Sequence, residues 1–428
     1  MPTNWKKYKL SDLGTVARGK SKHRPRDAAH LYGGNYPFIQ TGDVKAASHK
    51  LYKHSQTYSE AGLAQSKLWP KGTMCITIAA NIAETSILTY PACFPDSIIG
   101  FIADESICDI DFIEFMMQYF KKEVQSHSIG SVQDNINLGT FERLQFLIPP
   151  LPEQKAIAQI LSAIDDKIEN NLAINKTLED MAMALYKHWF VDFGPFQDGE
   201  FVDSELGLIP IDWEVKRLEE LSEIGSSKRI FLKEYVEEGI PFYRGKEIIQ
   251  LSKGTNISTE LFITEERFKE IKSKFGVPVK GDILISSVGT IGVSWLVDDS
   301  NEFYFKDGNL TWLKKYKTFL KGEFLHLWLN SKVGQEQILG ETIGSTQQAL
   351  TISSLRSLKL VFPPKSIYQK IEQDIINSYN QIQLNLLEIK TLTKLRDTLL
   401  PKLISGDVRL NEFREQVEPV VARNEAIS

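Results

Sequence analysis

The sequence predicts an α+β protein: two similar α/β domains joined by two long antiparallel coiled-coil helices, with a pseudo-twofold internal repeat. Three observations predict this fold. Residues 129–185 reappear 214 positions later without a gap, each copy changes at a Pro-Pro pair from short β-type runs to helical spacing, and the apolar residues that follow keep a heptad pattern. A period of this length exceeds the ~50 residues of a solenoid unit, so we expect separate domains with matching connectors.

The internal repeat is defined by residues that match at nearly constant offsets. Ile129-Gly130-Ser131 matches Ile343-Gly344-Ser345, and Pro149-Pro150 matches Pro363-Pro364. Upstream, Trp5 matches Trp213, Val16 matches Ile224, and Pro37-Phe38 matches Pro241-Phe242. The expected parts are a domain at 1–150, a helix at 151–193, a linker at 194–211, a domain at 212–363, a helix at 364–410 and a tail, predicted disordered from its low apolar content, at 411–428.

Both domains are predicted to be rich in short strands. Runs of β-branched and apolar residues between turn signals, such as Met74–Ile78 and Ile283–Ser287, are typical of buried strands. The opening stretch Trp5–Leu13 differs, because its apolar residues are spaced by three and four and predict a short helix.

Two long helices are predicted after the Pro-Pro pairs. From Glu153 to about Phe190 the chain contains no Pro or Gly, and such a helix would be ~57 Å long at ~1.5 Å per residue. The second helix is expected to end between Pro401 and Gly406. Asn171 and Asn385 occupy equivalent positions of the heptad seam, where a polar residue lowers stability but fixes register. The alternative is that both Asn side chains lie on the solvated edge of a wider apolar stripe.

Composition indicates an intracellular, cytoplasmic protein with real hydrophobic cores. Hydrophobic residues make up 42% of the chain, and neither a run of 18 apolar residues nor a signal peptide is visible. Three widely spaced cysteines argue against a disulfide framework or a CxxC metal site.

Charge distribution is more informative than the net charge of −5. Residues 1–54 hold eleven Lys and Arg against three Asp, concentrated in one loop. Alternating cations on a loop can follow a phosphate backbone, although a charge run is also typical of a solvated face. The candidate phosphate contacts are Arg18, Lys20, Lys22, Arg24 and Arg26 in the first copy and Lys228, Arg229, Arg244 and Lys246 in the second.

Each domain also carries a Gly-Ser loop dense in amide side chains. Asn and Gln can bond adenine through two hydrogen bonds at its major-groove edge, so these loops are candidate base readers, with plain turns as the alternative. The candidates are Ser131, Gln133, Asn135 and Asn137 in the first copy and Ser345, Thr346, Gln347 and Gln348 in the second.

Several motifs imitate catalytic sites without their context. Residues Gly14–Ser21 fit the phosphate-binding loop letter by letter, but a buried strand before and a helix after it are not predicted. The E-x-K triplets at 153–155 and 388–390 lie on the long helices and are interpreted as solvated charges. Seven scattered His residues offer no metal-ligand spacing. We therefore expect a non-catalytic chain without metal or cofactor.

The combination of motifs resembles the specificity subunit of type I restriction–modification systems over about residues 1–410. The elements that carry the resemblance are Pro-Pro-Leu-Pro-Glu-Gln at 149–154, the helix end at 185–193, Leu-Gly-Leu-Ile-Pro at 206–210 before Trp213, and the helix end at 400–406. The second copy departs from this opening. Its Pro-Pro pair is followed by Lys365-Ser366-Ile367, whereas the first pair is followed by Leu-Pro-Glu.

The resemblance implies two target recognition domains, each reading one half of a bipartite double-stranded DNA sequence, with the helices as a ruler. It further implies two modification subunits that methylate adenine N6 with S-adenosylmethionine and restriction subunits that use ATP and Mg²⁺. Trp189 and Phe190 are candidates for docking the modification subunits, with the alternative that Trp189 completes the intramolecular core. A two-domain scaffold that binds proteins rather than DNA is the rival hypothesis.

Overall fold

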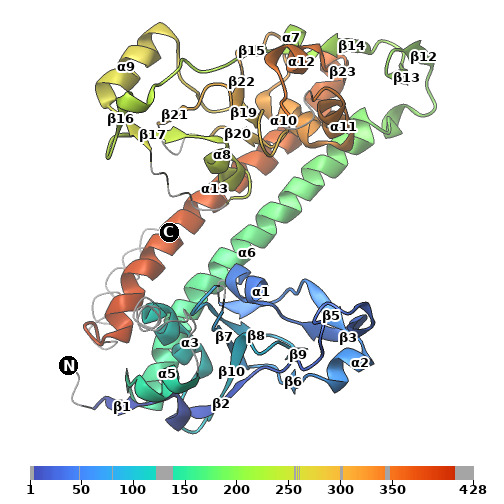
Figure 1. The fold of residues 1–428 in the computed structure, drawn as a ribbon. Helices are drawn as coiled ribbons and strands as arrows, with labels where there is room; N and C mark the ends of the chain where they lie inside the picture. Colours follow the sequence, from blue (N-terminus) through green and yellow to red (C-terminus); the bar gives the residue numbers. More distant parts are fainter. Residues whose placement is uncertain are drawn as a thin grey trace, which may run out of the picture. The chain divides into compact units, whose positions relative to one another are not determined.

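The computed structural model describes residues 4–47, 49–79, 81–121, 138–254, 257, 259, 261–298, 302–342 and 348–409. The chain divides into two compact units, one made of Met1–Ile168 with Thr391–Ser428 and the other of Glu169–Lys390. Each unit holds one mixed α/β domain and a stretch of each of two long helices (Figure 1).

The first domain is built on a five-stranded sheet whose central strand β7 (Met74–Thr77) is buried at every residue. The order of this sheet is β2 (Gly14–Arg18), β10 (Ile98–Ala103), β7, β8 (Thr85–Leu88) and β4 (Lys50–Leu51). A second sheet has the order β5 (Gln56–Tyr58), β3 (Tyr32–Phe38), β9 (Ala92–Cys93) and β6 (Leu68–Trp69). The helices are α1 (Thr41–Ala46), α2 (Glu60–Ala64), α3 (Ile110–Tyr119) and α5 (Leu138–Arg143), and β1 (Lys6–Tyr8) pairs with β11 (Phe146–Ile148).

The second domain repeats this plan. Its main sheet has the order β15 (Glu223–Gly225), β22 (Leu310–Lys314), β19 (Ile283–Ser286) and β20 (Ser294–Leu296). The other sheet has the order β16 (Tyr235–Val236), β18 (Phe262–Ile263), β17 (Ile240–Tyr243) and β21 (Tyr304–Phe305), and β14 (Glu214–Arg217) pairs with β23 (Lys359–Phe362). The helices are α7 (Leu218–Leu221), α8 (Gly245–Leu251), α9 (Glu265–Lys274), α10 (Gly322–Asn330), α11 (Lys332–Gly340) and α12 (Ile352–Ser357).

Strand register shows that the two domains are copies of one fold. In the first, Val16 lies opposite Phe101, which in turn lies opposite Met74. In the second, the matching Ile224 lies opposite Leu313, which lies opposite Ile283. The predicted repeat is therefore confirmed at the level of individual strand pairs.

The two long helices, α6 (Leu151–Phe190) and α13 (Lys365–Ile404), run where the heptad pattern predicts them. Each begins directly after a Pro-Pro pair, which lacks the amide donors needed to extend the preceding strand. The carbonyl oxygen of Pro150 accepts from the amide of Glu153 at 2.9 Å, and that of Pro364 from the amide of Ile367 at 3.0 Å. Most of the predicted seam positions are buried: Ile157, Leu161, Ile164, Ile168, Asn171, Asn175 and Ala182 on α6, and Ile371, Ile375, Ile382, Asn385, Ile389, Leu399 and Leu403 on α13.

The predicted helix at Trp5–Leu13 is wrong. Lys6–Tyr8 form β1, antiparallel to β11, and only Leu10–Asp12 make one turn of 3-10 helix. Trp5, Leu10 and Leu13 are nevertheless all buried. Trp5 precedes the strand, Leu10 begins the 3-10 turn and Leu13 follows it, so each side chain reaches the core from a different element. Pairing with a strand about 140 residues away decides the conformation here, and no local pattern reports it.

The predicted linker at 194–211 contains a small hairpin of β12 (Phe201–Ser204) and β13 (Gly207–Pro210). Gly207 has a φ of +93°, which a residue with a side chain rarely adopts, and it allows the tight connection. Phe193 and Phe196 pack edge-to-face on Trp213, so these aromatic contacts attach the start of the linker to the second domain. Within the described residues, none of the helices has the length and apolar character needed to cross a membrane.

Candidate nucleic-acid interface

The basic loop of the first domain, residues 19–28, starts at the end of edge strand β2 and is fastened to the turn before β10. The amide of Gly19 donates to the carbonyl of Ile98 at 2.8 Å, and the amide of Lys20 to that of Phe94 at 3.0 Å. A Cβ on Gly19 would lie 2.3 Å from the carbonyl oxygen of Pro95, so only glycine permits this approach. The backbone is therefore held while the cations reach solvent.

Arg18 at the end of β2 and the two arginines of this loop are oriented by acceptors beside them. Arg26 contacts both carboxylate oxygens of Asp96 at 2.8 Å, and Nε of Arg18 donates to the carbonyl of the same residue at 3.1 Å. Arg24 donates to the carbonyls of Ser21 and His23. An exposed ion pair contributes only ~0–1 kcal/mol, so phosphate oxygens can compete for these guanidinium groups. The structure thus brings two of the predicted cations, Arg18 and Arg26, to Asp96.

The second domain has the same arrangement with fewer cations. Nε of Arg229 donates to Asp307 at 2.7 Å. Asp307 precedes β22 as Asp96 precedes β10, so an arginine after the edge strand pairs with an aspartate of the same turn in both copies. The backbone amide of Lys228 donates to the hydroxyl of Tyr304 at 2.6 Å. The side chain of Lys228 is exposed, and its ammonium group lies 5.3 Å from the centre of the Phe275 ring.

Arg244, predicted as a phosphate contact, pairs in the structure with a buried carboxylate. Its guanidinium group donates to Glu247 at 2.8 and 3.3 Å, and its amide caps the same carboxylate at 2.8 Å. Burial alone would raise the pKa of Glu247, but the hydrogen bonds and charge of Arg244 lower it. The arginine thus neutralises a fully buried carboxylate at the start of α8, whereas the neighbouring Lys246 is exposed.

The predicted amide-rich readers lie almost entirely outside the described residues. Only Gln348 is described, and it is exposed just before Leu350, whose amide donates to the carbonyl of Ser287 at 2.9 Å. The others outside the described residues are Ser131, Gln133, Asn135, Asn137, Ser345, Thr346 and Gln347.

The seam asparagines are buried and join the two long helices within the second unit. Asn171, 1% exposed, donates to Glu388 at 2.8 Å, and Asn385, 5% exposed, donates to Asn175 at 2.7 Å. The prediction that they lie inside the seam is confirmed, and the solvated-edge alternative is wrong. The two asparagines bond to different partners rather than to each other, and Glu388 of one E-x-K triplet is engaged instead of freely solvated.

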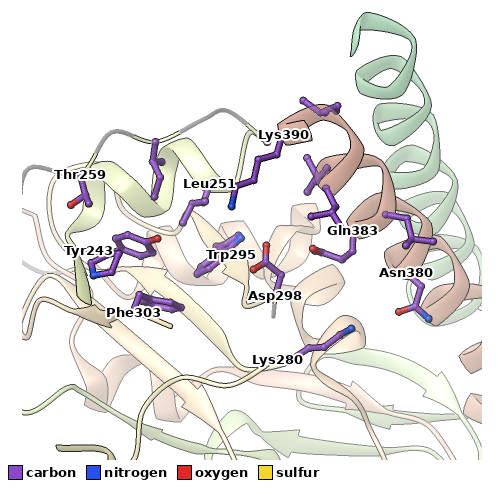
Figure 2. Close-up of a pocket in the computed structure, with 17 residues that line it drawn as sticks. Tyr243, Leu251, Thr259, Lys280, Trp295, Asp298, Phe303, Asn380, Gln383 and Lys390 are labelled. Atoms are coloured by element: carbon purple, nitrogen blue, oxygen red, sulfur yellow. The ribbon is translucent and has the colours of Figure 1, made fainter. Parts of the chain in front are cut away.

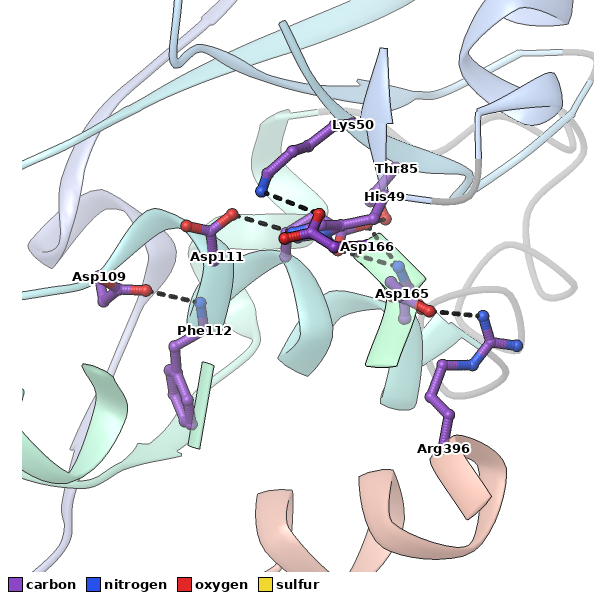
Figure 3. Close-up of polar contacts among 11 residues, drawn as sticks. His49, Lys50, Thr85, Asp109, Asp111, Phe112, Asp165, Asp166 and Arg396 are labelled. Atoms are coloured by element: carbon purple, nitrogen blue, oxygen red, sulfur yellow. Dashed lines mark hydrogen bonds and ion pairs between the residues drawn. The ribbon is translucent and has the colours of Figure 1, made fainter. Parts of the chain in front are cut away.

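In the first unit, a charged network connects strand β4 of the five-stranded sheet to α3 and α6 (Figure 3). His49 bonds Glu114 at 2.7 Å through Nδ1 and Asp111 at 2.9 Å through Nε2. Burial alone would lower the pKa of His49, but the two carboxylates outweigh it and raise the pKa to about 10. The imidazole is therefore an imidazolium at neutral pH.

The same region of the first unit contains an ion pair between α6 and α13. Arg396 donates to Asp165 at 3.0 Å (Figure 3). Burial raises the pKa of Asp165, and the charge of Arg396 offsets part of that rise. Lys50, next to His49, lies 3.7 Å from Asp166 on α6.

The structure corrects the docking role predicted for Phe190. This ring is 3% exposed and packs at a centroid distance of 4.9 Å from Phe324 and 5.7 Å from Trp213, inside the core of the second unit. Trp189 is half-buried at the edge of this core, 6.0 Å from Phe196. Phe190 is therefore part of the intramolecular core.

Among the described residues, neither a nucleotide loop nor a cluster of His, Cys, Asp and Glu able to hold a metal is found. The stretch that imitates a phosphate-binding loop begins as edge strand β2, and the loop after it leads to a 3-10 turn rather than to a helix. The three thiols are buried, and burial raises the pKa of Cys108 to about 12, which keeps it protonated.

Two features escaped the sequence reasoning. The His49 network joins residues about 60 positions apart, and an open cavity in the second unit is lined by Tyr243 and Trp295. A single His next to Lys50 does not indicate a charged network from the sequence alone. Two aromatic residues in strands likewise do not indicate a cavity. The only available hint was that Tyr243 and Trp295 have no matching aromatic residue in the first copy.

Comparisons with known proteins agree on one relationship. A family model described as the type I restriction modification DNA specificity domain matches residues 2–180 and again residues 210–396. The type I restriction enzyme MjaIX specificity subunit of Methanocaldococcus jannaschii is 29% identical over 431 residues, 96% of this chain and 95% of that protein. The type I restriction enzyme HindI specificity subunit of Haemophilus influenzae is 24% identical over 351 residues, 68% of this chain and 74% of that protein.

A solved structure shares the fold along nearly the whole chain. The S subunit of a type I restriction-modification system from M. genitalium has a TM-score of 0.57 at 18% identity, with 94% of this chain and 96% of that chain covered. Each of the two family matches spans one recognition sheet together with a large part of the long helix that follows it.

Proposed function

This chain belongs to the type I restriction–modification DNA specificity family, and from that membership we propose that each of its two domains reads one half of a bipartite double-stranded DNA sequence. The chain is a specificity subunit with two tandem recognition domains. One observation carries the bipartite reading: each domain places an arginine and a lysine after its edge strand, with the arginine paired to the aspartate of the same turn.

The paired loops suit contact with phosphates better than base readout. Arg18, Arg26 and Arg229 are exposed and held by surface contacts that are weak enough to exchange for phosphate oxygens. Phosphate contacts position a protein on the duplex, whereas base-edge contacts specify the sequence. We assign the second task to the amide-rich loops that contain Gln133 and Gln347.

The long helices set the spacing between the two half-sites in this proposal. A helix of 40 residues, such as α6, is ~60 Å long at ~1.5 Å per residue. Half-sites read from one face of B-DNA lie ~34–36 Å apart, one helical turn. A stiff helix pair of this length can span that distance, and the buried Asn contacts prevent the helices from sliding.

The remaining chemistry belongs to partner subunits. We propose that the chain recruits two modification subunits, which methylate adenine N6 with S-adenosylmethionine, and restriction subunits, which use ATP and Mg²⁺. Trp189 remains the candidate contact at the end of α6, because its ring is only partly covered by the core.

A domain exchange tests the modular reading. Residues 212–363 are replaced by the same region of another specificity subunit, and genomic methylation is mapped in cells that supply the modification subunits. We expect only one half of the methylated sequence to change, with the same spacer. A change in both halves, or in neither, would show that the domains do not read independently.

A salt titration separates DNA recognition from a protein-binding scaffold. Contacts to phosphates release counterions, so duplex affinity should fall linearly on a log–log plot against salt concentration. A scaffold without DNA specificity would show no such retention on duplex DNA and no preference for the methylated sequence.

A further inference from the structure

Two large apolar side chains project from the loop that follows edge strand β15 in the second domain. Leu232 is 83% exposed and Phe231 is 56% exposed, whereas the neighbouring Ile230 is buried. Neither of the two lines the open cavity of the second unit, which Figure 2 shows beside α13. Single exposed apolar side chains are ordinary, but adjacent ones with a charged rim mark a contact surface.

The backbone that carries these two side chains is held in place. Leu232 begins the 3-10 turn Leu232–Glu234, which leads into β16. The amide of Phe231 donates to one carboxylate oxygen of Glu234 at 2.8 Å, and the other oxygen pairs with Arg267 on α9 at 2.9 Å. Because the turn is fixed by α9 and by the buried Ile230, both apolar groups are presented to a partner in an ordered position.

Three exposed cations flank the apolar pair, since Lys228 and Arg229 precede it and Lys233 follows it. The ammonium group of Lys228 lies 5.3 Å from the centre of the Phe275 ring, which is itself 48% exposed. Exposed carboxylates follow only after β16, at residues 237–238. The surface around the pair therefore suits a partner that carries negative charge.

The partner that combines negative charge with apolar faces is duplex DNA. Its phosphates lie outside and the flat faces of its bases lie inside, where they become accessible once two neighbouring base pairs unstack. Leu and Phe are among the side chains that proteins insert between base pairs. The burial of two such side chains is comparable in free energy with the unstacking of one step.

We propose that Phe231 and Leu232 form an apolar wedge that inserts into a base step of the half-site read by the second domain and kinks the duplex there. The inference rests on the proposed function and adds to it a pair of residues that determine specificity without a hydrogen bond. Pyrimidine–purine steps such as TA and CA/TG are the easiest to kink, so this half-site should contain one of them at the wedge.

The wedge belongs to the second domain alone. In the first domain the 3-10 turn Ala29–Leu31 leads into β3, as Leu232–Glu234 leads into β16. The two residues at the start of that turn are Ala28 and Ala29. Because an alanine methyl group is too short to separate stacked base pairs, only one of the two half-sites should be kinked.

DNA bending by the full chain tests the proposal. The probe is a duplex of ~30 base pairs that contains the methylated sequence, with a donor and an acceptor dye at its ends. Binding of the unmodified chain should shorten the distance between the dyes. In a second duplex, 2-aminopurine replaces each adenine of the half-site in turn, and its fluorescence should rise at the unstacked step.

Removing either side chain should weaken binding and straighten the duplex. Leu232→Ala and Phe231→Ala are each expected to lower duplex affinity ~5- to 30-fold, because less apolar surface is buried. Neither change removes a charge, so the log–log salt slope should stay the same, unlike that of the loop cations. Replacing thymine by uracil in this half-site should leave affinity unchanged, because the wedge does not read the thymine methyl group in the major groove.

Leu339→Ala is the matched control, because Leu339 is 61% exposed on α11 and residues 333–341 contain no Lys or Arg. It should bind and bend the duplex like the unmodified chain, and circular dichroism should show equal melting temperatures for all three variants. An unbent duplex, unchanged affinity in both wedge variants, or an equal loss with uracil would overturn the wedge alone.

Two further outcomes assign the apolar pair elsewhere. Self-association of the free chain that Leu232→Ala abolishes would make the pair a protein contact and overturn the wedge. A chain that binds the methylated sequence no better than an unrelated duplex would refute the proposed function itself, and with it the wedge.

Discussion

Asn385 on α13 donates a hydrogen bond of 2.7 Å to the side-chain oxygen of Asn175 on α6, 210 residues earlier in the chain. Asn171 on α6 bonds Glu388 on α13, so the partner number falls as the position on α6 rises, as antiparallel helices require. The amide nitrogen of Asn175 is buried without a partner. The contact therefore costs stability while it defines one alignment of the two helices.

Replacing one or both asparagines should separate these two effects. Asn385→Leu is expected to lower the free energy of unfolding by ~1–3 kcal/mol, because the buried side-chain oxygen of Asn175 loses its donor. Asn175→Leu with Asn385→Leu should recover most of that loss. Urea unfolding of both singles and the double measures the coupling, with Asn377→Leu on the exposed face of α13 as control. Additive losses in the double variant would contradict this account.

The buried ion pair between Asp165 and Arg396 should behave asymmetrically. Arg396→Met is expected to cost ~3–5 kcal/mol at pH 7, since it strands a buried carboxylate, whereas Asp165→Leu with Arg396→Met should be close to neutral. The folded pKa of Asp165 is already raised, so the folded state binds this proton more tightly than the unfolded state. The loss in Arg396→Met should therefore shrink as the pH is lowered toward 4. A loss that is independent of pH would exclude an unpaired carboxylate as its cause.

The raised pKa of His49 predicts that the free energy of unfolding depends on pH in the alkaline range. Its folded pKa is about 10 against a usual value of 6.5, so its contribution is complete below pH 6.5 and is lost as the pH rises to about 10. Asp111 and Glu114 bond this imidazole, Lys50 acts electrostatically on Asp111, and the imidazole acts on Asp165 of α6. His49→Gln should cost ~3–5 kcal/mol at pH 6.5 and progressively less toward pH 10. Thermal unfolding at several pH values measures this, and the exposed His54→Gln should show no such trend.

The cations of the two basic loops should contribute to DNA affinity, and the salt dependence of binding should reveal that contribution. Lys22→Gln and Arg229→Gln are each expected to weaken binding uniformly across sequences and to reduce the log–log salt slope by ~1. Lys269→Gln, which removes an exposed cation of α9 that pairs with Glu265, is the matched control. Fluorescence anisotropy at four salt concentrations gives the slopes. Equal slopes in all variants would remove these side chains from the interface.

The length of the helices should determine the tolerated spacer. Seven residues inserted after Ile168 and seven after Lys390 keep the heptad register on both helices and add ~10.5 Å. At ~3.4 Å per base pair, the methylated sequence should gain ~3 base pairs of spacer with both half-sites unchanged. Insertion in α6 alone should instead destabilise the chain, because the Asn171–Glu388 and Asp165–Arg396 contacts on the two sides of the insertion can no longer both form. An unchanged spacer in the double insertion would refute the ruler.

Features that depend on local periodicity were predictable from the sequence alone. The heptad spacing after each Pro-Pro pair defines α6 and α13, because an amphipathic helix encodes its own buried face every three or four residues. The duplication was equally visible, since matched residues at a constant offset imply two copies of one fold. The basic loop was also visible in the sequence, because its cations lie close together along the chain.

Tertiary structure decided everything that joins distant residues. Trp5–Leu13 has helical spacing but forms β1, because pairing with β11 across the domain outweighs the local pattern. Arg244 was indistinguishable from Arg229 until its carboxylate partner was seen to be buried. The partners of Asn171 and Asn385, the charge state of His49 and the cavity beside Trp295 follow from burial and from contacts between segments up to 217 residues apart. Such contacts are energetically real but leave no periodic trace along the chain.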